Sequence, residues 1–212
     1  MIAAPLPGAL PVGRAFSEEF LRLRPLALDW IGVYREREHL ARTGDWMLAL
    51  DPEAAEPLVI AALTHDMERT VPGGPVIDKA RLAWDDPVYN AAHCARSAEV
   101  VGQWLVDRDI SDRFVQGIRQ PILEHEFGGS LEGDLIQAAD SISFLENNGG
   151  LIASWIERGE CSLDKGREKL RWMCDRVRLE RGREIARVQF ELAMAEVDQR
   201  LAQAEVDQRL AK

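Results

Sequence analysis

The segment Pro57–Asp66, PLVIAALTHD, is the strongest indication of the fold in this chain. Its side chains are apolar on nearly every side of a helix until a threonine, a histidine and an aspartate follow. A helix that is apolar all round lies inside a bundle, so we expect this one to be deeply buried. A buried His-Asp pair is costly unless each polar group finds a partner. The stretch therefore predicts a helical core with a polar site inside it.

Helical patterning continues on both sides of this stretch, and no segment shows the alternation of a strand bounded by turns. Upstream, Ser17 can cap a helix that Pro25 interrupts. Apolar residues then recur at helical spacing from about Leu26 through Leu50. We expect an all-α protein, an irregular helical bundle with an extended C-terminal helix.

Three parts are expected along the chain: an extended N-terminal arm at 1–16, a helical domain at 17–160, and a C-terminal helical extension at 161–212. The extension contains a perfect repeat, because AEVDQRLA occurs at Ala195–Ala202 and again at Ala204–Ala211. The offset amounts to two and a half helical turns, so the two copies point their apolar residues in opposite directions. One core cannot bury both, and the repeat predicts a long exposed helix.

Composition narrows the classes of function. The chain has 212 residues, 46% of them hydrophobic, and a formal net charge of −10. That charge argues against broad nucleic-acid binding, which needs clustered Lys and Arg, but it permits a local basic pocket for a small anionic substrate. Three cysteines without a C-x-x-C motif predict neither a disulfide framework nor a thiolate zinc site, and favour a cytoplasmic location. No apolar run is long enough to predict a membrane span, and the oligomeric state stays open, a homo-oligomer included.

The candidate chemistry lies in the histidines. The chain has four, each in or at the end of a different predicted helix: His39, His65, His93 and His125. Asp66 follows His65 directly, and Asp140 lies in another apolar stretch. Imidazole and carboxylate groups are the usual ligands of Mn, Fe, Co, Ni or Zn, and separate helices of a bundle can project them to one point. A single helical histidine is usually an ordinary core or surface residue, so the order and context of the set carry the prediction.

Three local sequences carry a resemblance: EHLARTGDW at 38–46, IAALTHDMER at 60–69 and LIQAADSISFLE at 135–146. Their order, H…HD…D, resembles the HD superfamily of metal-dependent phosphohydrolases over about residues 30–150. The resemblance implies an irregular helical bundle in which His39, His65, Asp66 and Asp140 bind a divalent metal. His93 and His125 match, in order, the extra histidines of two-metal members. One ion or two are both compatible with the sequence, and His125 is alternatively expected to line the pocket or bind substrate.

Three arginines lie at helical spacing from the histidines. Arg42 is three residues after His39, Arg69 is four after His65, and Arg96 is three after His93. Residues three or four apart share a helix face, and guanidinium groups suit phosphate oxygens. The arginines are therefore predicted to bind a small phosphorylated substrate. Alternatively, they pair with nearby glutamates or brace the ligand carboxylates.

Two acidic residues are candidates for catalysis. Glu68 lies two residues after Asp66 and is predicted to orient or deprotonate a metal-bound water, with Asp66 holding the metal. The alternative for Glu68 is a salt bridge to Arg69 or Arg42.

The resemblance leads to three hypotheses of function. The first is a phosphohydrolase that cleaves a phosphate ester, with a nucleotide as the commonest substrate class that the family implies. The second is an HD-type di-iron oxygenase, because all six ligand types occur in the right order. The third is a non-catalytic metal-binding regulatory protein, since some members of a small bacterial branch lose the HD pair. The intact pair at His65 and Asp66 argues against the third.

Overall fold

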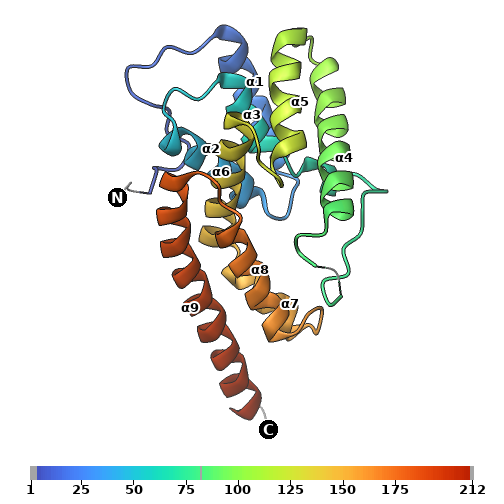
Figure 1. Cartoon of the computed structure of the whole chain (residues 1–212), viewed down its shortest axis with the longest axis vertical. Helices are drawn as coiled ribbons and strands as arrows, with labels where there is room; N and C mark the ends of the chain where they lie inside the picture. Colours follow the sequence, from blue (N-terminus) through green and yellow to red (C-terminus); the bar gives the residue numbers. More distant parts are fainter. Residues whose placement is uncertain (1–3, 82, 211–212) are drawn as a thin grey trace.

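The computed structural model describes residues 4–81 and 83–210. Within them the chain forms nine α-helices and one short 3-10 helix, and no strand, which confirms the all-α class (Figure 1). The helices are α1 (Glu18–Ile31), α2 (Arg37–Leu50), α3 (Glu56–Thr64), η1 (Met67–Thr70), α4 (Pro87–Val106), α5 (Asp112–Glu124), α6 (Leu131–Asn147), α7 (Gly149–Glu157), α8 (Leu163–Asp175) and α9 (Glu180–Leu210). None of the helices among these residues combines the length and apolar character needed to span a lipid bilayer.

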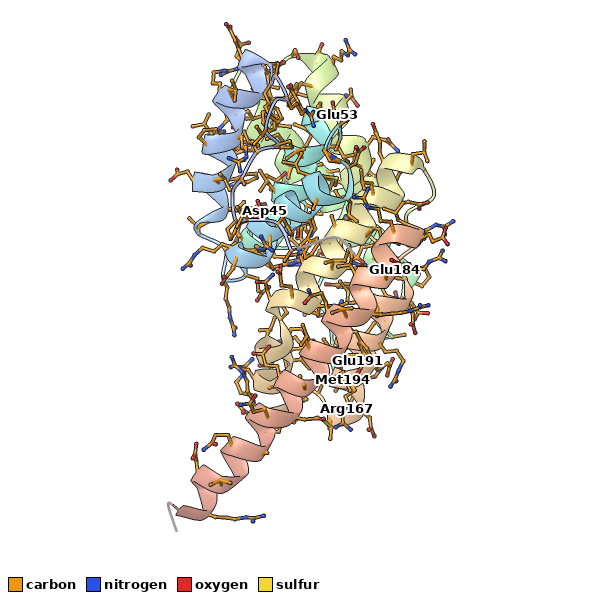
Figure 2. All side chains as sticks on the ribbon, turned by 90° about the vertical axis from the view of Figure 1, so that its left-hand side faces the viewer. Asp45, Glu53, Arg167, Glu184, Glu191 and Met194 are labelled. Atoms are coloured by element: carbon orange, nitrogen blue, oxygen red, sulfur yellow. The ribbon has the colours of Figure 1, made fainter. Side chains whose placement is uncertain are left out.

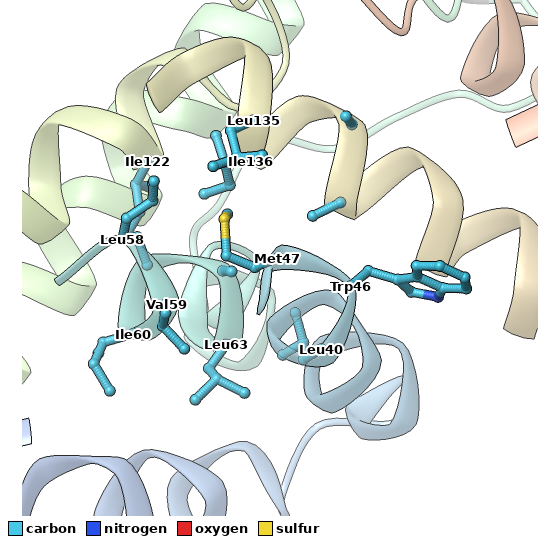
Figure 3. Packing of buried hydrophobic residues seen from close by; sticks show 14 of the residues in the cluster. Leu40, Trp46, Met47, Leu58, Val59, Ile60, Leu63, Ile122, Leu135 and Ile136 are labelled. Carbon is cyan, nitrogen blue, oxygen red and sulfur yellow. The ribbon is translucent and has the colours of Figure 1, made fainter. Parts of the chain in front are cut away.

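Helix α3 lies in the hydrophobic core, as its sequence predicts. Every residue from 58 to 64 is buried, and α3 packs against α1, α2, α5 and α6. Figure 3 shows Leu58, Val59 and Leu63 of α3 grouped around Met47 of α2. Ile122 of α5 and the N-terminal part of α6 close the cluster from the other side (Figure 3). This packing holds the end of α3, and therefore His65, at a defined place inside the bundle.

Helix α6 connects the two ends of the molecule. It packs against α2, α3 and α5 on one side and against α8 and α9 on the other. The C-terminal part of α9 extends beyond the rest of the body in both views (Figures 1 and 2). The two copies of the repeat differ accordingly, because Val197 in the first copy is buried and Val206 in the second is 46% exposed. The predicted long C-terminal helix is therefore present, but its first half is part of the core packing.

One expected helix boundary is wrong. Helix α1 runs through Pro25, and the chain breaks at residues 32–36 instead, so that the single helix expected from about Leu26 through Leu50 is two helices. Pro25 removes a backbone hydrogen bond to the carbonyl of Leu21. Both residues lie on the exposed face of α1, where water can satisfy that carbonyl. The break at 32–36 places Tyr34 at the pocket described below.

The N-terminal arm runs without a helix from residue 4 up to α1 and lies along the helical body. The backbone N–H of Gly8 donates to Asp45 Oδ1 at 2.9 Å. The guanidinium of Arg14 donates to the backbone carbonyls of Pro52 and Ala54. These bonds attach the arm to α2 and to the segment that joins α2 to α3.

We expect the substitution Gly117→Val to destabilise the protein by about 1–3 kcal/mol, because it overfills the contact between α3 and α5. A Cβ at Gly117 meets the Pro57 ring at 2.9 and 3.1 Å, and that ring cannot rotate away. The matched control is Gln116→Val, the same residue introduced at the exposed neighbouring position of α5. Urea unfolding curves measure both. Equal free energies of unfolding for the two variants would show that the helices adjust to each other without cost.

Candidate metal centre

Seven polar side chains meet inside the bundle, and six of them are the predicted metal ligands. His39 lies on α2, His93 on α4 and Asp140 on α6, while His65 and His125 are the residues that end α3 and α5. Asp66 and Glu126 each follow a terminal histidine directly. All four histidine side chains are buried. Residues that are up to 101 positions apart in the chain, from His39 to Asp140, therefore reach one small volume.

The seven side chains form three overlapping groups in which the candidate ligand atoms lie within 4.8 Å of one another. The groups are His39, His65 and Asp140; His65, Asp66 and His125; and His93, His125 and Glu126. They share His65 and His125, so they make one continuous set of donors. Nitrogen and carboxylate donors of this kind fit Mn, Fe, Co, Ni or Zn. The set contains more donors than one such ion takes, which leaves room for two ions.

Two imidazole rings are oriented by the helix ends that carry them. His65 Nδ1 lies 2.9 Å from the carbonyl of Ala62, and His125 Nδ1 lies 2.6 Å from the carbonyl of Ile122. A carbonyl only accepts, so each Nδ1 carries the hydrogen and each Nε2 is left with a lone pair. The last carbonyls of a helix have no partner within the helix, which is why a terminal histidine can bond one three residues back. This is the usual way in which proteins orient metal-binding histidines.

The other two rings are oriented by side chains from distant segments. His39 Nδ1 lies 3.1 Å from Ser143 Oγ, whose hydroxyl donates to the carbonyl of His39, so the serine accepts from the ring. His93 Nδ1 donates to Glu68 Oε1 at 2.9 Å. All four rings are thus held by Nδ1. In each of them Nε2 is the nitrogen left for a metal ion, and Nε2 of His93 also lies 3.3 Å from Arg69 Nη2.

The Nε2 atoms face one another and the carboxylates. His39 Nε2 and His65 Nε2 lie 3.1 and 3.4 Å from Asp140 Oδ1. His93 Nε2 lies 2.9 Å from Asp66 Oδ1 and 3.2 Å from His125 Nε2. Lone pairs that face each other at such distances need a cation or protons between them. Burial lowers the pKa of His125 to about 4, which keeps it in the neutral form that binds metals.

Each carboxylate presents one oxygen to the imidazoles and the other to a guanidinium. The Arg176 guanidinium, at the C-terminal end of α8, bonds Asp140 Oδ2 and Glu126 Oε2 at the same time. Its Nε donates to Ser141 Oγ at 2.8 Å. On the opposite side, Arg69 Nε donates to Asp66 Oδ2 at 2.9 Å. The guanidinium groups therefore fix which carboxylate oxygen is available to an ion.

These ion pairs keep the carboxylates charged although they are buried. Burial raises the pKa of Asp140, but Arg176 and His65 outweigh it and hold the pKa well below its usual range. Burial also raises the pKa of Glu126, but the attraction of Arg176 outweighs it and lowers the pKa to about 2. Arg69 and His93 lower the pKa of Asp66 in the same way. All three groups are therefore anionic ligand candidates at neutral pH.

The three predicted arginines lie in different environments. Only Arg69 lines the pocket, where it braces Asp66 as described above and donates to Tyr89 at 3.0 Å. Arg42 forms a two-point ion pair with Glu146 and lies away from the pocket. Arg96 donates to the carbonyl of Pro72 and lies near Glu68. Arg42 and Arg96 are therefore paired as the alternative predicts, whereas Arg69 both binds the Asp66 carboxylate and lines the cavity.

Glu68 contacts the candidate ligand His93 and does not line the pocket. Its Oε1 accepts from His93 Nδ1, and its Oε2 lies 3.5 Å from Arg96 Nε. The side chain is buried, and the segment at Gly74 packs so closely that a Cβ there would lie 2.4 Å from Oε2. This position gives Glu68 a role in orienting His93 and puts it out of reach of a water in the pocket.

A cavity of about 340 Å³ opens from the centre towards the α7–α8 side of the molecule. His39, Asp66, Glu126 and Asp140 form its inner end. Aromatic and cationic side chains form its walls, namely Tyr34, Tyr89, Phe144, Trp155, Arg69, Lys169 and Arg176. The predicted C-terminal extension thus contributes directly to the pocket, which is not confined to residues 17–160.

Sequence reasoning missed Glu126 as a candidate ligand and Arg176 and Lys169 as pocket residues. Glu126 had a signal, because it adjoins His125 as Asp66 adjoins His65. No signal marked Arg176 or Lys169, which lie in a helix with many charged residues outside the resembling region. Comparison with protein-family models, curated proteins and solved structures gives no match to this chain.

Proposed function

We propose that this protein is a metal-dependent phosphohydrolase of the HD type that cleaves a phosphate ester. One observation carries the proposal: four buried imidazoles, each held by Nδ1, turn Nε2 towards three carboxylates at the inner end of a pocket with cationic walls. The donor set suits a transition metal, and the cationic walls suit an anionic substrate. The order His39, His65-Asp66 and Asp140 adds the resemblance to HD phosphohydrolases.

The residues of the centre would bind metal ions, and the cations of the cavity wall would bind the substrate. His39, His65, Asp66 and Asp140 would hold one divalent ion, and His93, His125 and Glu126 complete a site for a second. When bound, such an ion lowers the pKa of a coordinated water and polarises a phosphoryl oxygen. Arg69 contacts Asp66, Tyr89 and His93 through Nε, Nη1 and Nη2, and the second N–H of each Nη would bind phosphate oxygens from the wall.

The aromatic side chains of the cavity wall would also keep bulk water away from a bound substrate. Tyr34, Phe144 and Trp155 also line the cavity. A bound substrate would therefore contact aromatic rings as well as cations. Excluding bulk water strengthens the attraction between the phosphate and the cationic walls. The cavity size fits a small phosphorylated compound, with a nucleotide as the leading class by resemblance.

Metal removal tests the proposal. Protein purified without chelators should contain at least one transition-metal ion per chain and should release phosphate from a panel of nucleotides and simple phosphate esters. Treatment with EDTA should abolish phosphate release, and Mn²⁺, Co²⁺ or Zn²⁺ should restore it. Phosphate release that persists in fully metal-free protein would contradict the proposal.

The same experiment separates the two alternative functions. An HD-type di-iron oxygenase would contain two irons per chain, consume oxygen and release no phosphate. A non-catalytic regulatory protein would bind metal and show neither activity. The cationic walls favour the hydrolase, because an oxygenase needs the six metal ligands but has no general need for a pocket lined with Arg69, Lys169 and Arg176.

We infer that the enzyme acts in the cytoplasm. Cys94, Cys161 and Cys174 are all free thiols. Unpaired cysteines are typical of a reducing compartment.

A further inference from the structure

Lys169 of α8 holds its ammonium group among aromatic rings beside the metal centre. Its Nζ lies 4.2 Å from the ring centroid of Trp172, 5.0 Å from that of Phe144 and 5.3 Å from that of Trp84. Within the described part of the chain, no carboxylate lies at ion-pair distance from Nζ and no hydrogen bond involves it. Ring faces attract a cation, but they accept no proton and leave the N–H donors directed elsewhere.

Two of these rings connect Lys169 to the centre. The Trp172 ring also packs against the Arg176 guanidinium, at 4.5 Å, and Arg176 bonds Glu126 and Asp140. The Phe144 ring packs edge-on against the His39 imidazole, with 5.9 Å between the centroids. Lys169 lines the same cavity as His39, Glu126 and Asp140. Its ammonium therefore lies in the cavity wall, separated by one ring from Arg176 and by another ring from His39.

Lys169 differs from the other cations of the cavity wall. Arg69 and Arg176 are already paired with ligand carboxylates, Lys79 is paired with Glu160 at 2.6 Å, and the remaining wall cation, Arg35, is a guanidinium. A guanidinium also never releases its proton in a protein, whereas a lysine ammonium can. Lys169 is thus the wall cation that combines free donors with a transferable proton.

We propose that Lys169 is the general acid of the reaction, which gives its Nζ proton to the leaving oxygen of the phosphate ester. The inference rests on the proposed phosphohydrolase function. In the step, the oxygen of a water forms a new bond to phosphorus, and the bond between phosphorus and the ester oxygen breaks. The ester oxygen keeps the electron pair, takes the proton from Nζ and leaves as an alcohol. The proton lost by the water returns Lys169 to its charged form through the solvent.

The charges around Lys169 suit this role. Burial of the ammonium lowers the pKa of Lys169 to about 8, and Arg176 at the end of α8 and Arg69 of η1 act in the same direction. Glu126 after α5 and Asp140 of α6 act against them and keep the group protonated at neutral pH. A general acid works best when its pKa lies near the working pH. Catalysis should therefore weaken as the pH rises above about 8, where Lys169 loses its proton.

Two phosphate esters with different leaving groups test the proposal. An aryl ester, 4-nitrophenyl phosphate, releases a stable anion and needs little protonation. An alkyl ester, glycerol 2-phosphate, releases a basic alkoxide and needs a proton. The substitution Lys169→Met should lower kcat on the alkyl ester by about 100-fold or more, the usual contribution of general acid catalysis, and on the aryl ester far less. The alkaline limb of the alkyl-ester pH profile should disappear in the variant.

Two further variants control for charge and packing. Lys169→Arg keeps the cation among the rings but cannot give up a proton, so it should stay slow on the alkyl ester. Lys165→Met, one turn earlier on α8, loses an ion pair with Glu168 and a contact of its ammonium with the Trp84 ring at 5.9 Å, but leaves Lys169 in place, so it should behave like the parent protein on both esters. Metal content and melting temperature of each variant show whether the centre is intact.

Equal losses on the two esters, or full alkyl-ester activity in Lys169→Arg, would overturn the role of Lys169 and leave the phosphohydrolase proposal standing. A parent protein that binds metal but hydrolyses neither these esters nor the nucleotide panel would overturn both.

Discussion

Replacement of Asp140 by asparagine should remove the bound metal and reduce phosphate release by at least about 100-fold, since loss of a ligand costs more than loss of its outer partner. Asp140 Oδ1 is the oxygen that faces both His39 Nε2 and His65 Nε2. The substitution keeps the shape of the side chain and removes its charge, so the two imidazoles lose the anion that completes their site. Metal analysis of the purified variant and assays with saturating metal measure the two effects.

Asp134→Asn is the matched control on the same helix. Asp134 pairs with the exposed Arg178 at 2.9 Å and lies outside the centre. An exposed ion pair contributes at most about 1 kcal/mol to stability, so this control should keep its metal and its activity. If the Asp140→Asn protein bound metal as tightly as the parent, the centre would not be the metal site that its geometry indicates.

Replacement of Arg176 by methionine should be the most destabilising single change around the centre. The Arg176 guanidinium pairs with Asp140 and Glu126 together, and all three side chains are at least nine-tenths buried. Removal of one partner from a buried ion pair costs about 3–5 kcal/mol, because the remaining charges stay buried without compensation. Urea unfolding of the metal-free protein at pH 7 measures this difference.

The pH dependence of that difference identifies its cause. The folded protein holds the pKa of Glu126 at about 2, below its ordinary value of 4.5, mainly through Arg176. A carboxyl group with a depressed pKa adds stability above its unfolded pKa and loses it as the pH falls towards the folded value. The difference between the parent and Arg176→Met should therefore be full at neutral pH and should narrow as the pH falls from about 4.5 towards about 2.

Two variants complete the test of Arg176. Arg178→Met removes a neighbouring exposed arginine whose partner, Asp134, is only partly buried, and it should cost no more than about 1 kcal/mol. Arg176→Lys keeps the charge but not the planar fork, so metal affinity should still fall by about 10- to 100-fold, as for other outer partners of metal ligands. A stability difference that did not depend on pH would assign the loss to packing against Trp172 alone.

Much of the fold follows from short-range patterns in the sequence. The all-round apolar stretch Leu58–Leu63 predicts a buried helix, and α3 is one. Ser17, Ser130 and Ser162 cap the helices that follow them by accepting backbone N–H bonds three residues on. The interruption predicted at Pro25 is wrong, because α1 continues through it. The cost of a proline inside a helix depends on whether the carbonyl that loses its hydrogen bond faces water. The order of residues along the chain does not show this.

The amino-acid order alone predicts most members of the centre: four histidines, Asp66 and Asp140, on helices that must pack their apolar faces together. The places of the other residues become known only from the packed bundle, in which Glu126 joins the ligands, Glu68 hydrogen-bonds His93, and Arg176 and Lys169 line the pocket. Helical periodicity reports which face of a helix is buried, but not which distant segment covers that face. Ligand pairing depends on contacts between segments far apart in the chain, and those contacts exist only once the bundle has closed.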